Sequence, residues 1–407
     1  MDRMHSCAAR GQDTAEVFRA LTAQLPEGAR GAQMVVAFYG CGHDDDLLGT
    51  ELRRYFPNAA LLGGSSAGGL MTERGVVDEQ GVGLLVLEDA AGEYGAAAGP
   101  LGHDPAAAAE ALLCQALASC GCEGQLPELV WIYQAPGHEE AVLEGLRRVV
   151  GNRCPIIGGT SADETVAGRW RQLGPEGALS DGLVVGVLFP SAAVGFAFQG
   201  GYEPAGPSGV VTGIGFEPNG ASGVVTVGHG REILSIDGEP AAAVYNRWTG
   251  GVIAGALERG GSILQQTTMF PLATDGGRID GVTHYLLMHP ESVTPAGGLR
   301  VFRDVAAGTR LFAMRGDRRR LIERAGRVSR QARRRLPDAL AVAGALVVYC
   351  GGCKIAVDGE IGDVAGAIAE SLHGAPFLGC FTFGEQGCLI DSNVHGNLMI
   401  SAVVFAH

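Results

Sequence analysis

Basic residues are scarce in this sequence. Its 407 residues include 30 lysines and arginines against 44 aspartates and glutamates, which gives a formal net charge of -14 at pH 7. Proteins that bind nucleic acid neutralise its phosphates with Lys and Arg. The charge balance therefore argues against nucleic acid as a partner.

Residues 315–335 depart from this balance because they are dense in arginine. A helix with many charges usually turns them to solvent and packs by its apolar residues. We expect such a helix here, packed on an acidic neighbour, with an anion-binding surface as the alternative. The partial apolar face consists of Leu321, Ile322, Val328 and Leu336.

Long hydrophobic runs are also lacking. The longest apolar stretch, residues 339–349, is too short to span a bilayer and continues into a glycine turn. The first residues do not combine the basic start, apolar stretch and small-residue cleavage site of a signal peptide. We therefore expect a cytoplasmic protein with no membrane partner, in which the ten cysteines are thiols rather than disulfides.

A regular zinc motif is missing as well. Cys350 and Cys353 have the spacing of a redox or metal pair, but Cys380 and Cys388 do not form a second pair of that spacing. We therefore predict no metal.

Hydrophobic residues and glycine are abundant. The hydrophobic content of 46% supports a large buried core and excludes a disordered chain. The 65 glycines indicate many tight turns and close backbone approaches.

Three segments share one order of predicted elements: residues 33–88, 128–189 and 344–405. In each, an apolar strand leads into a glycine-containing turn, a helix, a second strand that ends in a polar turn, and a later apolar strand. Self-similarity of this kind predicts three copies of one supersecondary unit.

The spacing inside the first two copies agrees. His43 and Gly63 are 20 residues apart, and so are His138 and Gly158. The third copy is longer, with 26 residues between its Cys353 and Gly379, and we place about six additional residues at positions 354–359.

The predicted fold class is α/β, with repeated strand-helix-strand-strand units that form mixed sheets. Residues 193–343 differ, because short apolar strands broken by Gly, Pro and Asn, as at residues 218–220, indicate a more antiparallel β insert. We expect an N-terminal helix within residues 1–29 and an α/β domain with two repeats over 30–192. The second domain, 193–407, would hold the insert and then the third repeat.

Turns at the carboxyl ends of the strands carry most candidate ligand contacts. Open α/β sheets usually bind ligands at this edge, and N–H groups beside paired glycines can receive a carboxylate or phosphate. The same hydroxyls can instead serve only to complete the turns. The predicted ligand-binding residues are Ser65, Ser66, Thr160, Ser161, Cys350, Cys380, Thr382, Glu385 and Asn397.

Two kinds of histidine stand out. His43 and His138 occupy the same register in their repeats, which favours a shared structural role such as bonding a neighbouring carbonyl. His395 precedes the last strand, and we expect it to reach Glu385 if both lie on one sheet edge. A carboxylate such as Glu385 in a glycine turn is suited to pairing with an amine.

Cys350 and Cys353 separate two classes of function. In a sensor they are small polarizable pocket walls, and Glu385 binds the cationic part of the ligand. In an enzyme one of them is a thiolate nucleophile, and the catalytic residues are Cys350, Cys353, Glu385 and His395. The spacing of these residues is compatible with a sensor and with an enzyme.

Several short motifs follow one another in a characteristic order and spacing. They are Ile157-Gly158-Gly159-Thr160-Ser161-Ala162-Asp163, Ser180-Asp181-Gly182, Ile236-Asp237-Gly238-Glu239-Pro240-Ala241 with Val244-Tyr245, Cys350, Phe377-Leu378-Gly379 with Phe383-Gly384-Glu385, and His395-Gly396-Asn397. Together they resemble the FIST family of intracellular sensory proteins, which have an N-terminal and a C-terminal FIST domain. The resemblance covers about residues 30–405 and implies a sensor that binds a small ligand, such as an amino acid or another small polar metabolite.

The resemblance has two further implications. Family members often carry a fused output module, for which this chain has no room, so we expect a separate signalling protein as partner. Some stand-alone members look like haem-binding nitric-oxide sensors, which need an axial histidine. We expect no cofactor, with haem as an alternative and His229, His284 and His289 as its candidate ligands.

Overall fold

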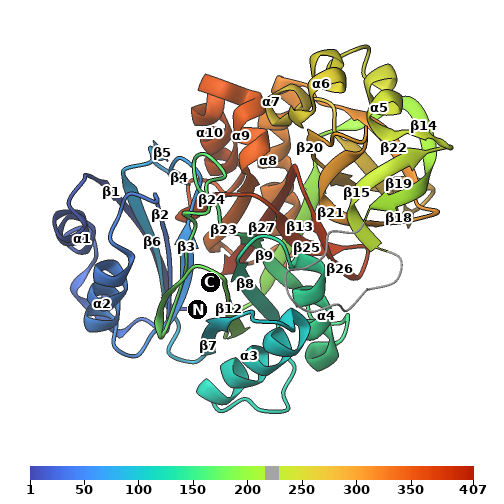
Figure 1. Cartoon of the computed structure of the whole chain (residues 1–407). Helices are drawn as coiled ribbons and strands as arrows, with labels where there is room; N and C mark the ends of the chain where they lie inside the picture. The colour runs from blue at the N-terminus through green and yellow to red at the C-terminus, as the bar shows by residue number, and fades with distance from the viewer. Residues whose placement is uncertain (216–228) are drawn as a thin grey trace.

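The computed structural model describes residues 1–215 and 229–407, so the predicted turn at 218–220 lies outside the described residues. Three six-stranded sheets surround one shared apolar core, and helices cover the outer face of each sheet (Figure 1). A fourth sheet of nine strands lies beyond them. The predicted α/β class with mixed sheets is confirmed.

Strand β2 (Met34–Tyr39) shows why the strands read as continuous apolar runs. Val36 and Phe38 point into the shared core, whereas Val35 and Ala37 join the apolar layer between the sheet and its helices. Successive side chains point to opposite faces, so a strand buried on both sides needs apolar residues at every position.

The first unit forms sheet A, in the order β1-β6-β2-β3-β10-β11. The predicted leading helix is present as α1. Residues 3–10 form a strand that was not predicted, and this strand pairs along its length with β6. The elements are β1 (Arg3–Arg10), α1 (Thr14–Thr22), β2, α2 (Asp45–Tyr55), β3 (Ala60–Ser65), β4 (Leu70–Thr72), β5 (Gly75–Val77) and β6 (Gly81–Glu88).

The second unit forms sheet C, in the order β26-β25-β9-β8-β12-β7. Its elements are β7 (Glu93–Pro100), α3 (Pro105–Ser119), β8 (Leu129–Gln134), α4 (Glu139–Val150), β9 (Ile156–Thr160), β10 (Gln172–Gly174), β11 (Gly177–Leu179) and β12 (Gly182–Phe189).

The third unit forms sheet B, in the order β13-β27-β23-β24-β4-β5. Its elements are β13 (Val194–Gly200), α8 (Arg318–Arg333), β23 (Val342–Cys350), α9 (Gly351–Val357), α10 (Ile361–Ser371), β24 (Phe377–Thr382), β25 (Glu385–Leu389), β26 (Ser392–Gly396) and β27 (Met399–Ala406).

The strand register confirms the repeat. Ala37 pairs with Gly63 and Ile132 with Gly158, each across 26 residues, whereas Val347 pairs with Gly379 across 32. The longer connection holds α9 and the 3-10 turn Asp358–Glu360, close to where the additional residues were predicted.

Each unit lends a hairpin to the sheet of another unit. The hairpin β4-β5 of the first unit pairs with β24, the hairpin β10-β11 of the second pairs with β3, and the hairpin β25-β26 of the third pairs with β9. This cyclic exchange interlocks the units. The domain limits at 30–192 and 193–407 stay a prediction.

The predicted β insert is present, and every strand pair described in its sheet is antiparallel. No helix among residues 1–215 and 229–407 is long and apolar enough to cross a membrane. The insert comprises β14 (Glu203–Gly215), β15 (His229–Ile236), β16 (Glu239–Pro240), α5 (Ala241–Trp248), α6 (Ala254–Arg259), β17 (Gly261–Ser262), α7 (Leu264–Thr267), β18 (Leu272–Ile279), β19 (Val282–Met288), β20 (Pro290–Val293), β21 (Leu299–Ala306) and β22 (Arg310–Arg315).

The arginine-rich helix is α8. Its residues Leu321, Ala325 and Val328 are buried in the apolar core that covers the outer face of sheet B. The expected packing by the apolar face is confirmed, and the acidic neighbour is Glu203 of β14, which pairs with Arg320.

Candidate functional site

Four polar side chains form a row across sheet C. Gln134 is the partner of Thr160 in the parallel register, Gln386 Nε2 donates to Thr160 Oγ1 at 3.1 Å, and Gln386 is the partner of His395. Ile132 lies two residues before Gln134, and Ile156 lies four residues before Thr160. Both isoleucines belong to the apolar layer beneath α3 and α4. The period of two thus places the row on the outer face of the sheet, near α4.

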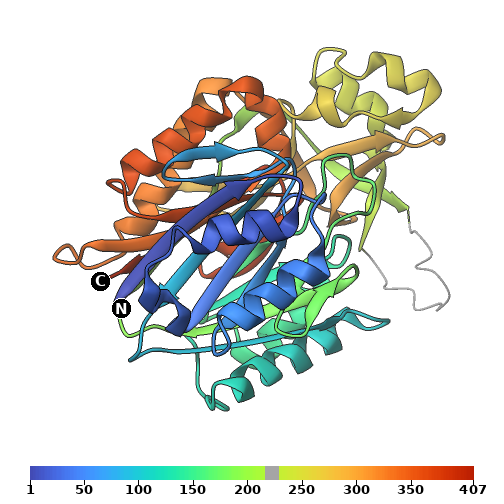
Figure 2. The same cartoon turned by 90° about the vertical axis from the view of Figure 1, so that its left-hand side faces the viewer.

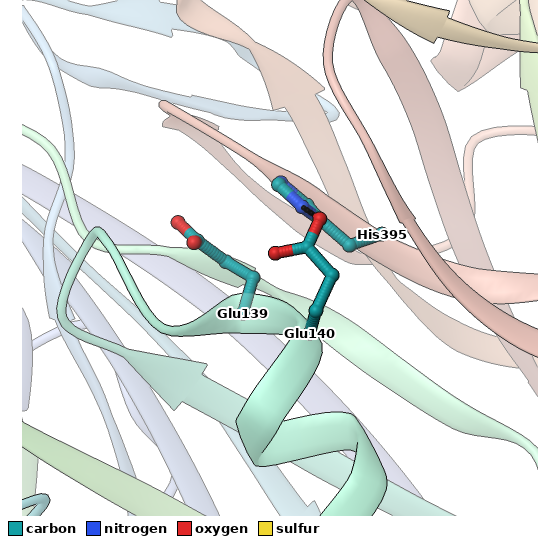
Figure 3. A group of neighbouring side chains, drawn as sticks. All are labelled: Glu139, Glu140 and His395. Carbon is teal, nitrogen blue, oxygen red and sulfur yellow. Dashed lines mark hydrogen bonds and ion pairs between the residues drawn. The ribbon is translucent and has the colours of Figure 1, made fainter. Parts of the chain in front are cut away.

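Helix α4 brings two carboxylates to this row. Thr160 Oγ1 donates to Glu139 Oε1 at 3.2 Å, and His395 Nδ1 lies 2.9 Å from Glu140 Oε1. Figure 3 shows Glu139, Glu140 and His395 converging from the start of the helix and from the neighbouring strand. The helix follows β8 after a short turn, so its first residues lie at the carboxyl edge of the sheet.

The β insert closes the group with Arg231 from β15. Its guanidinium donates to Glu139 Oε2 at 2.7 Å and to Glu140 Oε2 at 3.0 Å, while its Nε donates to Asp304 Oδ1 at 3.0 Å. We call this group the α4 site. Its members are Gln134, Glu139, Glu140, Thr160, Arg231, Gln386 and His395.

The two glutamates hold their charge although Glu139 is buried and Glu140 is partly buried. Burial alone would raise the pKa of Glu139, but Arg231 and His395 lower it, and the net pKa lies below its ordinary value. For Glu140 burial likewise raises the pKa, and His395 and Arg231 bring it well below its ordinary value. The site therefore presents fixed negative charge beside fixed positive charge.

The donor atoms of Glu139, Glu140 and His395 lie within 4.8 Å of one another, a spacing that a metal ion could use. However, Arg231 already bonds both carboxylates and supplies the positive charge that a metal would bring.

Three buried polar groups around the α4 site lack a hydrogen-bond partner among the residues described. They are both amide atoms of Gln134, Oε1 of Gln386 and Nε of Arg303. Gln134 and Gln386 are fully buried. Arg303 Nε lies 4.0 Å from Glu140 Oε1, which is within ion-pair range but too long for a hydrogen bond.

The comparisons with known proteins point to one family. A model of the FIST N domain matches residues 33–214, and a model of the FIST C domain matches residues 241–388. The chain belongs to the FIST family. No curated protein matches it.

Among solved structures, this FIST protein is similar to a cyanuric acid hydrolase from A. caulinodans, at 11% identity and a TM-score of 0.36, covering 100% of this chain and 99% of the other. A second cyanuric acid hydrolase structure matches at 8% identity and a TM-score of 0.37, covering 100% of both chains.

Two residues predicted from the sequence belong to the α4 site of this FIST protein, Thr160 and His395, and Asn397 lies beside it with Nδ2 3.5 Å from His395 Nε2. The expected partner of His395 was wrong, because it pairs with Glu140 rather than with Glu385. The prediction overlooked Gln134, Glu139, Glu140, Arg231 and Gln386. A signal for the glutamates was available, since they follow His138 as Asp44 and Asp45 follow His43.

Three other predicted residues occupy matching positions on the opposite face of their sheets. Ser66 donates to the carbonyl of Gly69, Ser161 accepts from Gln172 Nε2 at 2.6 Å, and Thr382 donates to Glu385 Oε1 at 2.7 Å. Each hydroxyl is buried and ties a strand end to the hairpin that follows. Their ligand contact stays a prediction.

Ser65 is similarly engaged. Its hydroxyl donates to the carbonyl of Ala162 at 3.0 Å and accepts from the Arg171 N–H at 2.8 Å. His43, which we expected to bond a carbonyl, lies with Nε2 3.0 Å from the Gln80 carbonyl oxygen. The side chain of His138 makes no capping bond to α4, and the role shared by the two histidines stays a prediction.

Glu385, at the start of β25 in sheet C, and Cys350, at the end of β23 in sheet B, form a separate buried pair. Glu385 Oε2 accepts from the Met399 N–H at 3.0 Å, and burial together with the neighbouring Cys350 thiol raises its pKa well above the ordinary value. Burial also raises the pKa of Cys350. A nucleophilic cysteine needs a lowered pKa, so the geometry favours a packed thiol over a thiolate.

The other predicted thiols are also buried. Cys353 Sγ lies 3.7 Å from the Tyr202 hydroxyl, and Cys380 is in the core shared by the three sheets. Cys350 is the common neighbour of Glu385 and Cys353, whereas Cys380 points to the other face of its sheet.

The predicted haem ligands are His229, His284 and His289. His289 is buried, with Nε2 3.0 Å from Thr267 Oγ1 and 3.2 Å from the Leu264 carbonyl oxygen. His284 is half-buried, and the side chain of His229 lies outside the described part of the chain. Haem binding stays a prediction.

Proposed function

We propose that this FIST protein is a cytoplasmic sensor that binds a small amino acid-like metabolite at the α4 site and signals through a separate protein. The observation that carries the proposal is Gln134. It is fully buried beside fixed charges, yet neither its amide nitrogen nor its amide oxygen has a hydrogen-bond partner among the described residues. A buried polar atom left without a partner costs about 1–3 kcal/mol, so such a side chain suits a place where a ligand completes the bonding.

The charges at the α4 site define the ligand chemistry. Glu139 and Glu140 are suited to an ammonium group, and Arg303 offers a buried N–H for a carboxylate. The amide nitrogen of Gln134 can donate a hydrogen bond to a neutral polar group of the ligand, and its amide oxygen can accept one. An α-amino acid carries these groups within a few ångströms of one another.

Arg231 supplies a route for the signal. It belongs to the β insert but bonds both glutamates of α4, so an ammonium group at these carboxylates competes with it. Ligand binding would then alter the contact between the insert and the second unit. A conformational change requires such a difference in contacts between the free and bound states.

Thermal unfolding with a panel of amino acids tests the proposal. A ligand at about 100 times its Kd stabilises the native state by about 2.7 kcal/mol. We expect stabilisation by at least one amino acid and not by the matching amine or carboxylic acid alone, because both charges are needed. The Gln134→Ala variant should fold and lose this stabilisation.

Two further variants locate the site. Glu144→Gln, which changes an exposed residue of the same helix, should keep the response to the ligand. The Glu385→Ala variant tests the alternative that the ligand binds beside Cys350. Loss of the response in Glu385→Ala together with its retention in Gln134→Ala would place the ligand beside Glu385 and Cys350 and contradict the α4 site.

A further inference from the structure

The segment around α8 has a charge opposite to that of the remaining chain. Residues 315–335 contain ten arginines and only two acidic residues, Asp317 and Glu323, a local net charge of +8. The whole chain has a net charge of -14, so the other residues together carry -22. The basic charge is concentrated on one element.

Helix α8 turns most of these arginines to solvent. It lies against α10 on the outside of sheet B, which Figures 1 and 2 show from two sides. At about 100° per residue, five exposed arginines fall within one face, opposite the buried residues. We call this face the arginine stripe, and its members are Arg319, Arg320, Arg327, Arg330 and Arg334.

The protein itself neutralises only part of the arginine stripe. Glu323 pairs with Arg319 and Arg327, and Glu203 pairs with Arg320. Arg330 and Arg334 have no carboxylate partner in the part of the chain that the structure describes. Positive charge therefore remains available along the helix.

The helix retains these charges against its own stability. Arg318, Arg319 and Arg320 occupy the first turn, which has no acidic residue, although the positive end of a helix dipole disfavours cations. Like charges three or four positions apart also repel each other along a helix. Covering the sheet requires only the apolar face, so the arginines point to a further role.

We infer that the arginine stripe is the docking surface for an acidic segment of the separate signalling protein, an inference that rests on the proposed sensory function. A helix of this length extends about 24 Å at 1.5 Å per residue, which matches about seven extended residues of a partner. Arginine forks bind Asp and Glu carboxylates in pairs of hydrogen bonds. A nucleic acid fits less well, because a longer polyanion would continue onto the acidic remainder of the surface.

Fluorescence anisotropy with a fluorescein-labelled peptide of eight glutamates tests this surface. The wild-type protein should bind the peptide, more weakly as salt rises from 50 to 150 mM, and should not bind a peptide of eight lysines at this face. The Arg319→Glu/Arg330→Glu variant should lose at least about ten-fold in affinity, as expected when two attractive contacts become repulsive. The milder Arg319→Gln/Arg330→Gln variant should have an affinity between those of the wild type and the Arg→Glu variant. Circular dichroism verifies that both variants are folded.

The matched control is Arg19→Glu/Arg54→Glu, which reverses two exposed arginines on α1 and α2. This variant should bind the glutamate peptide as the wild type does. Equal affinity in the α8 and control variants overturns the inference, and so does tighter, α8-dependent binding of a 12-base-pair DNA. The α8 variants should still be stabilised by the amino acid, because their substitutions lie outside the α4 site. If the protein binds the glutamate peptide but no amino acid stabilises it, the arginine stripe is supported as a docking surface and only the sensory role is contradicted.

Discussion

Glu140 and His395 are 255 positions apart in the sequence, yet Nδ1 of the histidine lies 2.9 Å from Oε1 of the glutamate. The contact joins the start of α4 in the second unit to β26 in the third. It exists because the hairpin β25-β26 leaves its own unit and pairs with β9. The exchange of hairpins between units therefore builds the α4 site.

The Glu140→Gln variant should be less stable than the wild type at pH 7 by about 1–3 kcal/mol, because His395 and Arg231 lose a partly buried charged partner. The pKa of Glu140 lies below its ordinary value of 4.5, so its stabilisation is present above that pH and is lost as the pH falls through the lowered pKa. Urea unfolding at several pH values should show the difference between variant and wild type narrowing below pH 4.5. Glu144→Gln, on the exposed side of the helix, should change stability by less than about 0.5 kcal/mol.

Glu385 should have the opposite pH dependence. Its pKa in the folded state is raised by burial, so above the ordinary value of 4.5 the native state keeps a proton that the unfolded chain has released. Stability is then lost as the pH rises toward the folded pKa, by up to about 1.4 kcal/mol per pH unit. In urea unfolding, the stability of the Glu385→Gln variant relative to the wild type should increase between pH 5 and pH 8. Exposed Glu176→Gln serves as the control, and parallel curves for Glu385→Gln and the wild type would refute a protonated Glu385.

The thiols should differ in reactivity. Cys350 and Cys353 are buried, and burial raises the pKa of Cys350, whereas Cys114 is exposed. With iodoacetamide at pH 7.5, mass spectrometry of the native protein should find Cys114 modified first and Cys350 modified only after unfolding. Cys114→Ser should remove the fast reaction. Rapid modification of Cys350 in the native state would instead revive the cysteine-enzyme alternative.

Two glycines at matching positions should respond differently to substitution. At Gly158, with a φ of +159°, an added Cβ would lie 1.8 Å from the Ile132 carbonyl oxygen, whereas at Gly379 the nearest atom is the flexible Met71 Cε at 3.0 Å. Gly158→Ala should cost more than about 3 kcal/mol or prevent folding, and Gly379→Ala about 1 kcal/mol. Thermal unfolding and soluble yield measure both. Similar losses for the two variants would show that the units do not differ at this point.

The buried strands and the repeat could be predicted because their signals are local. Strand β2 is apolar at every position since both of its faces are covered, and the spacing from His43 to Gly63 recurs from His138 to Gly158. Strand β1 was missed. Its residues include His5, Ser6 and Arg10 among apolar ones, and only pairing with β6 makes the segment a strand.

The candidate site could be predicted only in part. Thr160 and His395 were recognised because they stand in polar turns or beside the last strand. Glu139 and Glu140 resemble ordinary acidic residues at the start of a helix, and Arg231 lies in the insert, far away in sequence. Gln134 gives no signal in the sequence, because only the structure shows that its amide is buried without a partner.

The sequence by itself determined the α/β class, the three repeated units, the antiparallel insert and the family, since strand periodicity, turn residues and spacing depend on neighbours along the chain. The tertiary structure decided which unit receives each hairpin, which acid His395 meets, and that Glu385 and Cys350 are enclosed. Those outcomes depend on contacts between residues hundreds of positions apart, where burial and charge act through space.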